Sequence, residues 1–230
     1  MALTPLVCLP GLLGDARIFE PFARLARRSR EVHCLDLPPG PPRQAARELD
    51  LPRGSFHVLT GSYGGLVARC LPPERMLSLA CVATLPDRSL CPRSVELQSR
   101  MLARMPSTLV ERLYARRLDR VLAEDGVRSE LADRLHRLDR DTLVGRLRGV
   151  LDWDLPPQPQ VPTLWVLGAT DPMAPWSVGE ILRWHPHVQA CHVPGGHRPY
   201  ASHPGPLLTR LQGFWSEAGA SSLDEDKQHR

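Results

Sequence analysis

The chain has almost no lysine, and this scarcity decides how its charge is interpreted. Of its 29 basic residues only Lys227 is a lysine, and the rest are arginines. Together with 24 prolines, this bias is typical of a genome's base composition. The net charge of +4 is mild. Arginine content alone therefore indicates no nucleic-acid partner, and we expect none.

The sequence also lacks long apolar runs and paired cysteine motifs. No run approaches the roughly 18 apolar residues of a membrane-spanning helix. The first nine residues are apolar but have neither the basic region nor the cleavage site of a signal peptide. The six cysteines include no C-x-x-C pair, so neither a zinc site nor a disulfide framework is predicted. We expect a protein of the reducing cytoplasm, with no membrane span, metal or organic cofactor.

Short apolar runs alternate with amphipathic segments over the first 90 residues. Four runs predict buried strands: Leu6–Leu9, Glu31–Leu37, Ser55–Thr60 and Leu77–Leu85. Helical spacing occurs between them, at Ala16–Arg27, Arg43–Leu49 and Gly64–Leu71. This alternation predicts an α/β fold, with a mostly parallel sheet and helices on both faces.

The alternation stops between Cys91 and Asp154, where no strand is expected. Four amphipathic segments there predict helices: Val95–Met105, Thr108–Leu118, Val127–Leu138 and Thr142–Leu151. Strands resume at Thr163–Leu167 and Val188–Val193, and a helix from about Pro206 to Ala218 follows. We expect residues 1–90 and 155–218 to form one core and residues 91–154 a helical insert. The polar residues 219–230 are expected to be a disordered tail.

Ser62 lies in the segment TGSYGG, between an expected strand and an expected helix. A nucleophile elbow needs this placement, because its sharp turn pushes the serine oxygen out above the sheet. The turn brings strand and helix together, so small residues are needed two positions either side of the serine. Gly64 meets this need, and Thr60 stands where glycine is usual. An ordinary glycine-rich turn fits the motif equally well, whereas a P-loop would require a following Gly-Lys-Ser/Thr.

A serine nucleophile needs a neighbouring base, and His197 is the candidate among nine histidines. It ends the segment PGGH, which follows the last expected strand. Ligand sites of parallel sheets lie outside this carboxyl edge. We expect His57, within a strand, and His136, within the helical insert, to be structural. Four further histidines lie near the same region: His185, His187, His192 and His203.

Asp171 is the candidate acid that orients the histidine. It follows the expected strand Thr163–Leu167 and gives the chain order Ser, Asp, His. An aspartate in this position is often only a turn or cap residue. Asp87, after the fourth expected strand, is the alternative acid, since a carboxylate at that edge could also reach the histidine.

Acyl transfer also needs two N–H donors directed at the developing negative charge. The backbone amide of Tyr63, the residue after the serine, is one candidate. The amide of Leu12 is the other, because Gly11 allows the loop after the first strand to approach a substrate closely. Taken alone, this loop is equally compatible with a plain Gly-Pro turn. The four signals together, in this order and at matching strand ends, predict a serine hydrolase.

At these residues the chain resembles the α/β-hydrolase superfamily, over roughly Leu6 to Trp215. The resemblance rests on the segments PGLLGDARIF, TGSYGGLVAR, LGATDP and PGGHRPYASHPGPL. The family usually has His-Gly in place of Pro10-Gly11, and glycine in place of Thr60. The resemblance implies that residues 91–154 form a helical lid over an acyl pocket, and that a small acyl ester is the substrate.

Hydrolysis of a carboxylic ester through an acyl-enzyme is the expected reaction. A thioesterase or a carbon–carbon bond hydrolase would use the same triad, and a non-catalytic binding protein would usually lack one triad residue. Haloalkane dehalogenases and epoxide hydrolases need an aspartate at the elbow, where this chain has Ser62.

A closer likeness concerns the segments SYGGLVA and HRPYASHP, which are similar to those of pimeloyl-acyl-carrier-protein methyl ester esterases of biotin synthesis. This likeness implies a basic lid that receives an acidic acyl carrier protein, as in these enzymes. Residues 93–148 contain 13 arginines and nine acidic residues, and such a basic face could steer an acidic partner. Genome bias and solvated helix faces are the alternative explanation.

Overall fold

Six parallel strands form a single sheet in the computed structural model, which describes residues 4–228 except 92, 133–134 and 136–137. Their order is β2-β1-β3-β4-β5-β6, and every neighbouring pair is parallel. The strands are β1 (Leu6–Leu9), β2 (Val32–Cys34), β3 (Phe56–Gly61), β4 (Met76–Val82), β5 (Thr163–Gly168) and β6 (Gln189–Val193). The predicted α/β fold with a parallel sheet is confirmed.

Strand β2 is shorter than the sequence predicts. Of the expected strand Glu31–Leu37, only three residues pair in the sheet. The chain then leaves the ladder, because the Leu37 N–H donates to the Gly14 carbonyl at 2.8 Å. The end of β2 is thereby tied to the loop that follows β1.

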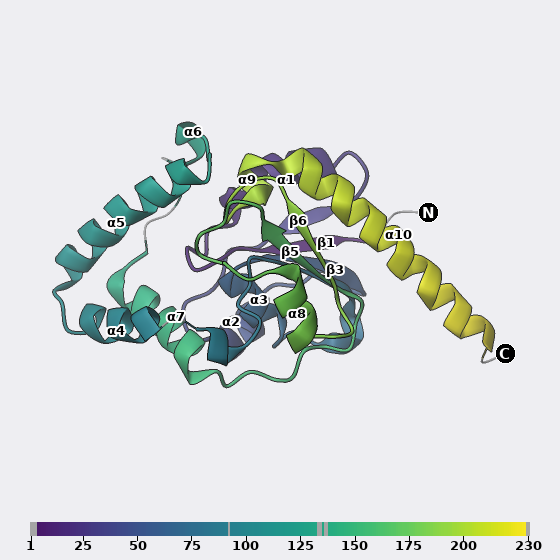
Figure 1. The fold of residues 1–230 in the computed structure, drawn as a ribbon, viewed down its shortest axis with the longest axis horizontal. Helices are drawn as coiled ribbons and strands as arrows, with labels where there is room; N and C mark the ends of the chain where they lie inside the picture. Colours follow the sequence, from purple (N-terminus) through teal and green to yellow (C-terminus); the bar gives the residue numbers. More distant parts are fainter. Residues whose placement is uncertain (1–3, 92, 133–134, 136–137, 229–230) are drawn as a thin grey trace.

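Helices cover both faces of the sheet (Figure 1). One face carries α1 (Glu20–Ala26), α9 (Pro199–Ser202) and α10 (Pro204–Gln228), and the other carries α2 (Pro42–Glu48), α3 (Tyr63–Ala68) and α8 (Val178–Trp184). Side chains of β1 alternate between the two cores, with Leu6 and Cys8 in one and Val7 and Leu9 in the other. Three short 3-10 helices connect these elements: Ala16–Phe19, Pro73–Arg75 and Arg88–Leu90.

Helix α8 was not among the elements expected from the sequence. Its N-terminus carries a capping box, in which the Ser177 hydroxyl accepts from the Glu180 N–H and the Glu180 carboxylate accepts from the Ser177 N–H. The Ser-x-x-Glu spacing of Ser177 and Glu180 is typical of a helix start and could have predicted α8.

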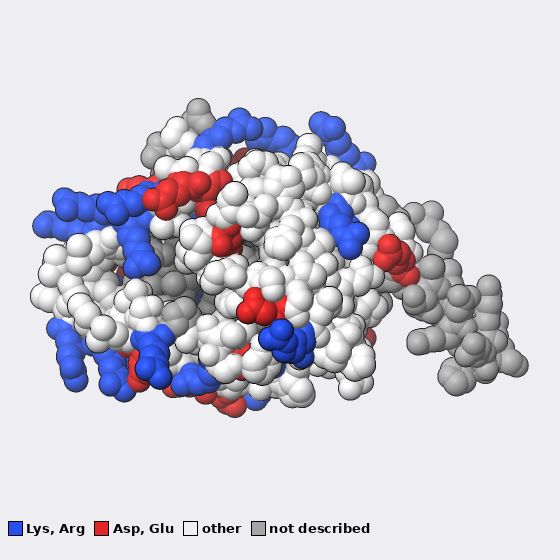
Figure 2. Space-filling model, in the orientation of Figure 1, with Lys and Arg blue, Asp and Glu red and all other residues white. Residues whose placement is uncertain are grey.

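Between β4 and β5 the chain forms the helical segment, which we define as α4 (Arg93–Leu102), α5 (Ser107–Glu124), α6 (Ser129–Ala132) and α7 (Arg140–Asp152). Helices α4, α5 and α6 lie to one side of the sheet layers (Figure 1), and exposed arginines gather over this part of the surface (Figure 2). Helix α7 packs on the start of α2, where Gly149 leaves room for Pro41 and Pro42.

The third expected helix of this segment, Val127–Leu138, is only four residues long as α6. Residues 133–134 and 136–137, including His136, lie outside the described residues. Leu131 and Leu135 are buried in the same core as α1 and α10, so this part of the chain contributes to that core.

The C-terminal helix continues past Ala218, so the disordered tail expected over residues 219–230 is helical as far as Gln228. Helix α10 reaches Gln228 and projects away from the sheet (Figure 1). After Gly219 the segment contains no glycine or proline, and its leucine, glutamate, lysine and glutamine residues favour helix. No helix in the described part of the chain is both long and apolar enough to cross a membrane.

The turn between β3 and α3 is packed tightly against β1. A side chain at Gly64 would overlap the carbonyl oxygens of Leu9 and Pro10, so only glycine allows this approach. Thr60, at the position where glycine is usual, is fully buried, and its hydroxyl donates to the Ala80 carbonyl of β4 at 3.3 Å. The threonine is therefore accommodated within the sheet.

Gly64→Ala should destabilise the fold by about 1–3 kcal/mol, because the added methyl group meets backbone that cannot move aside. Gly145→Ala is the matched control. No atom lies within 4 Å of a Cβ at this position of α7, and alanine favours helix by up to about 1 kcal/mol over glycine. Urea unfolding of both variants measures the difference. Equal stability of the two variants would contradict the tight packing of the turn.

Candidate functional site

Ser62 occupies a sharp turn at the carboxyl end of β3. Its φ of 48° and ψ of −113° lie in a sparsely populated region for a residue other than glycine. The Ser62 N–H donates to the Val82 carbonyl of β4 at 2.7 Å, which holds the turn in place. The serine is partly exposed. This strained strand–turn–helix geometry is that of a nucleophile elbow.

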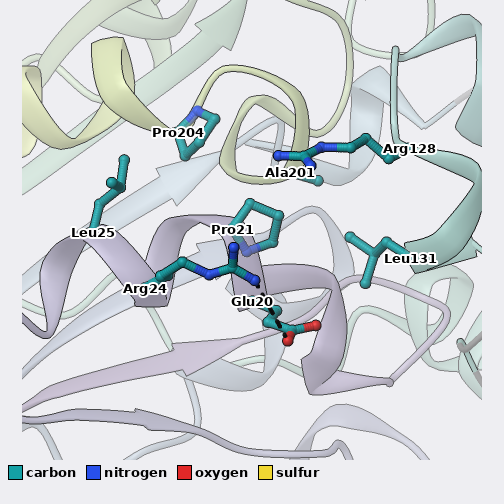
Figure 3. Close-up of a pocket in the computed structure, with 8 residues that line it drawn as sticks. All are labelled: Glu20, Pro21, Arg24, Leu25, Arg128, Leu131, Ala201 and Pro204. Carbon is teal, nitrogen blue, oxygen red and sulfur yellow. Dashed lines mark ion pairs between the residues drawn. The ribbon is translucent and has the colours of Figure 1, made fainter.

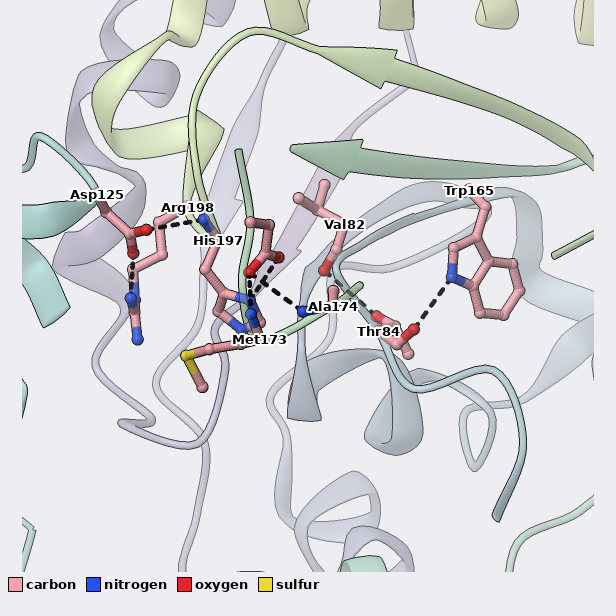
Figure 4. Close-up of polar contacts among 9 residues, drawn as sticks. Val82, Thr84, Asp125, Trp165, Met173, Ala174, His197 and Arg198 are labelled. Carbon is pink, nitrogen blue, oxygen red and sulfur yellow. Dashed lines mark hydrogen bonds and ion pairs between the residues drawn. The ribbon is translucent and has the colours of Figure 1, made fainter. Parts of the chain in front are cut away.

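His197 and Asp171 form a buried pair. The His197 Nδ1 and the Asp171 Oδ2 lie 2.8 Å apart, and the two residues are only 5% and 8% exposed. The other carboxylate oxygen, Oδ1, accepts from the N–H groups of Met173 and Ala174, at 2.8 and 3.2 Å (Figure 4). With these three donors the carboxylate is fixed in position, and so is the imidazole ring it contacts.

The pKa of Asp171 reflects these contacts. Burial raises the pKa of the carboxyl, but the hydrogen bond and charge of His197 and the two backbone N–H groups together hold it below its ordinary value. Asp171 is therefore ionised at neutral pH and accepts the Nδ1 proton of His197, which leaves Nε2 free to act as a base.

The loop that carries His197 lies beside the serine turn. Tyr200, three residues after His197, packs so closely on Gly61 that any side chain at that position would overlap its ring. The described residues contain no hydrogen bond between the Ser62 hydroxyl and His197. Such contacts commonly tighten only when substrate binds.

The loop after β1 approaches Ser62 from the other side. A Cβ on Gly11 would lie 3.3 Å from the Ser62 Cβ, so the backbone here is as close as a glycine permits. The loop makes a tight turn in which the Gly14 N–H donates to the Gly11 carbonyl at 2.9 Å. The Leu12 amide stands within this turn, and the Tyr63 amide stands at the first position of α3. Of the two predicted N–H donors, Leu12 is thus next in sequence to a residue that contacts Ser62, and Tyr63 is next to Ser62 itself.

Asp87, the alternative acid, takes part in a different local structure. Its side chain accepts from the Ser89 N–H at 2.8 Å and caps a 3-10 helix. The carboxylate that accepts from His197 Nδ1 is that of Asp171.

The other described histidines have different surroundings. His57 contacts the Ser78 hydroxyl at 2.8 Å, and burial, reinforced by Arg30, lowers its pKa to about 4. His185 stacks on Trp165 with ring centroids 5.0 Å apart. His203 contacts Ser202, and His187 and His192 are exposed.

Asp125 also contacts the site, although the sequence patterns do not indicate it. It ends α5, is only 6% exposed, and accepts from the His197 backbone N–H at 2.8 Å (Figure 4). Its other oxygen forms a buried ion pair with Arg198. Gly196 provides the space, because a side chain there would overlap the carboxylate. No local motif marks this residue, since it lies 72 positions from its partner.

A cavity of about 280 Å³ lies beside His197 and is lined by Val121, Glu124, Asp125, Thr170, Pro172, Met173 and His197. A second cavity, of about 360 Å³, is lined by Glu20, Pro21, Arg24, Leu25, Arg128, Leu131, Ala201 and Pro204 (Figure 3). None of the predicted site residues lines the larger cavity. The described residues include no cluster of three metal-ligating side chains.

Asp171→Asn should alter the pH dependence of stability. Because the pKa is lowered in the folded protein, the ionised carboxylate stabilises the fold above its ordinary pKa of 3.8. This contribution is lost as pH falls through the lower pKa of the folded state. The Tm advantage of the wild type over the variant should therefore shrink from about pH 6 to about pH 3. A Tm difference that stays constant across that range would contradict the lowered pKa of Asp171 in the folded protein.

The comparisons with known proteins agree with this geometry. The model of the alpha/beta hydrolase family matches residues 6–210. Structurally, the chain is similar to a thermophilic esterase from Thermogutta terrifontis, at 19% identity and a TM-score of 0.71, covering 94% of this chain and 91% of that one. An enol-lactonase from Burkholderia xenovorans LB400 matches at 15% identity and a TM-score of 0.71, covering 94% and 92%.

The thioesterase domain from the curacin biosynthetic pathway matches at 16% identity and a TM-score of 0.66, covering 91% of each chain. At these identities the structural likeness shows the fold alone. No curated protein sequence gives a significant match. The family model covers most of the chain and agrees with the parallel sheet and the serine turn, so the protein belongs to the alpha/beta hydrolase family.

Proposed function

We propose that the protein is a serine hydrolase that cleaves carboxylic esters, with Ser62 as nucleophile, His197 as base and Asp171 as the orienting acid. The observation that carries the proposal is the buried hydrogen bond between Asp171 and His197, at the same sheet edge as the strained turn of Ser62. A glycine-rich turn alone would not require a buried carboxylate–imidazole pair beside it.

In the first half-reaction, His197 Nε2 takes the proton of the Ser62 hydroxyl as its oxygen attacks the ester carbonyl. The Leu12 and Tyr63 amides donate to the resulting oxyanion. Collapse of the tetrahedral intermediate breaks the bond to the alcohol, which leaves with the proton from His197.

In the second half-reaction, His197 removes a proton from water, and the resulting hydroxide attacks the acyl-enzyme. Collapse then releases the acid and returns the proton to Ser62. These steps use only the side chains and amides already described. The six scattered cysteines, none in a C-x-x-C pair, are the basis on which we place the reaction in the reducing cytoplasm.

Ser62→Ala should reduce kcat on p-nitrophenyl butyrate by at least about 10³-fold while leaving the fold intact, because the nucleophile is lost. Ser202→Ala, which alters a serine of α9 close to His197, is the matched control and should retain wild-type kcat. Circular dichroism checks the fold. Full activity of Ser62→Ala would exclude the proposed nucleophile. Thioesters and carbon–carbon substrates in the same assay would distinguish the related activities of this triad.

We further propose that the helical segment is a lid over the acyl site and that the arginines of α4, α5 and the turn between them receive an acidic acyl carrier protein. Seven arginines of α4, α5 and the turn between them are exposed: Arg93, Arg100, Arg104, Arg112, Arg116, Arg117 and Arg120. Only four acidic residues lie in the same stretch, so the face is basic (Figure 2). A carrier-borne ester, such as a pimeloyl methyl ester, is the substrate that this face favours.

If the basic face steers a carrier protein, kcat/KM on a carrier-bound pimeloyl methyl ester should fall steeply with salt, whereas kcat/KM on p-nitrophenyl butyrate should not. Charge reversal of Arg116 and Arg117 to Glu should produce the same selective loss. The control is Arg53→Glu, which alters an exposed arginine just before the amino end of β3. Equal effects on both substrates would contradict steering by the basic face and would leave genome base composition as the explanation for the arginines.

A further inference from the structure

Helix α7 carries three arginines, and two of them, Arg146 and Arg148, lie in opposite environments. Arg148 is exposed, whereas Arg146 is only 2% exposed and reaches into the body of the protein. Its guanidinium donates to the Leu12 carbonyl at 2.7 Å, to the Leu37 carbonyl at 2.6 Å and to the Pro38 carbonyl at 3.2 Å. These carbonyls belong to the loops that follow β1 and β2, so one side chain of the helical segment joins both loops.

The burial of Arg146 carries a cost in free energy that its hydrogen bonds must offset. Its hydrogen bonds in the structure go to backbone carbonyls rather than to a carboxylate, and burial lowers its pKa. A buried cation without a counter-ion is expensive in free energy. The chain also leaves space for it: a side chain at Gly14 would overlap the guanidinium, and the φ of Gly14 is +78°. An apolar side chain would cover the same loops at lower cost, so the three directed bonds are the distinctive feature.

The two peptide units that flank Leu12 are held by different contacts, one within the turn and one from Arg146. The Gly11 carbonyl, on the unit that carries the Leu12 N–H, accepts from the Gly14 N–H at 2.9 Å. The Leu12 carbonyl, on the next unit, accepts from Arg146. Both units are therefore held, and Gly11 rests against Ser62. Removing the guanidinium would leave the turn held by its own hydrogen bond and by the Leu37 N–H alone.

We propose that Arg146 is a positioning residue for the oxyanion hole, which holds the Leu12 amide in the direction that the tetrahedral oxyanion requires. The inference rests on the proposed function and adds a role for the helical segment within the catalytic framework. The oxyanion forms only after attack, so the loss of this orientation should reduce kcat and leave KM nearly unchanged.

The test compares Arg146→Met and Arg146→Lys with Arg148→Met, a matched loss of one arginine on the same helix. Active sites are first titrated with a fluorophosphonate, so that kcat refers to folded, reactive protein. Arg146→Met should lower kcat on p-nitrophenyl butyrate by about 10- to 100-fold with KM within about twofold. Its affinity for a trifluoromethyl ketone, which forms a tetrahedral oxyanion on the serine, should fall by the same factor. Arg148→Met should match the wild type.

Arg146→Lys keeps the charge but cannot reach three carbonyls at once, so kcat and ketone affinity should lie between those of the wild type and Arg146→Met. This variant also decides the matter if Arg146→Met does not fold. Normal kcat per titrated site and normal ketone affinity in the folded variants would overturn the inference and leave the proposed function standing. A wild type that neither hydrolyses esters nor reacts with the fluorophosphonate would overturn both.

Discussion

The close approach of Gly64 to the backbone of Leu9 and Pro10 is the contact on which the candidate site depends. It places the turn after β3 directly against the end of β1, so one packing contact fixes the positions of Ser62 and the Leu12 loop relative to each other. The parallel register of β5 and β6 then brings Asp171 and His197 to the same edge. Most of the proposed site thus follows from strands that run in one direction and from a few positions where only glycine fits.

Two buried polar side chains connect the helical segment to this edge. Asp125 holds the backbone of His197, and Arg146 holds the carbonyl of Leu12. The first contact bears on the proposed base, in the loop after β6, and the second on one proposed oxyanion donor, in the loop after β1. We infer that movement of the helical segment would disturb both contacts at once.

The positions of the strands along the chain, the serine turn and the Asp171–His197 pair could be predicted because each has a local signal: an apolar run, a glycine spacing or a strand end. Asp125 and Arg146 could not be predicted, since their partners lie 72 and 134 positions away and nothing local distinguishes them from the exposed charges on the same helices. The end of α10 was missed for a different reason: its polar sequence also favours helix. The expected helix Val127–Leu138 is too long, since Leu135 and Leu138 are not helical; an amphipathic pattern does not fix helix length.

The central claim is that Ser62 carries the acyl group during turnover. The most direct test is an acid quench of the reaction with p-nitrophenyl butyrate, followed by peptide mapping by mass spectrometry. The account predicts a butyryl group on Ser62, formed in step with an initial burst of p-nitrophenol and lost as the ester is exhausted. Turnover of the ester with the butyryl group on another residue, or with no acylated peptide under conditions that show a burst, would contradict it.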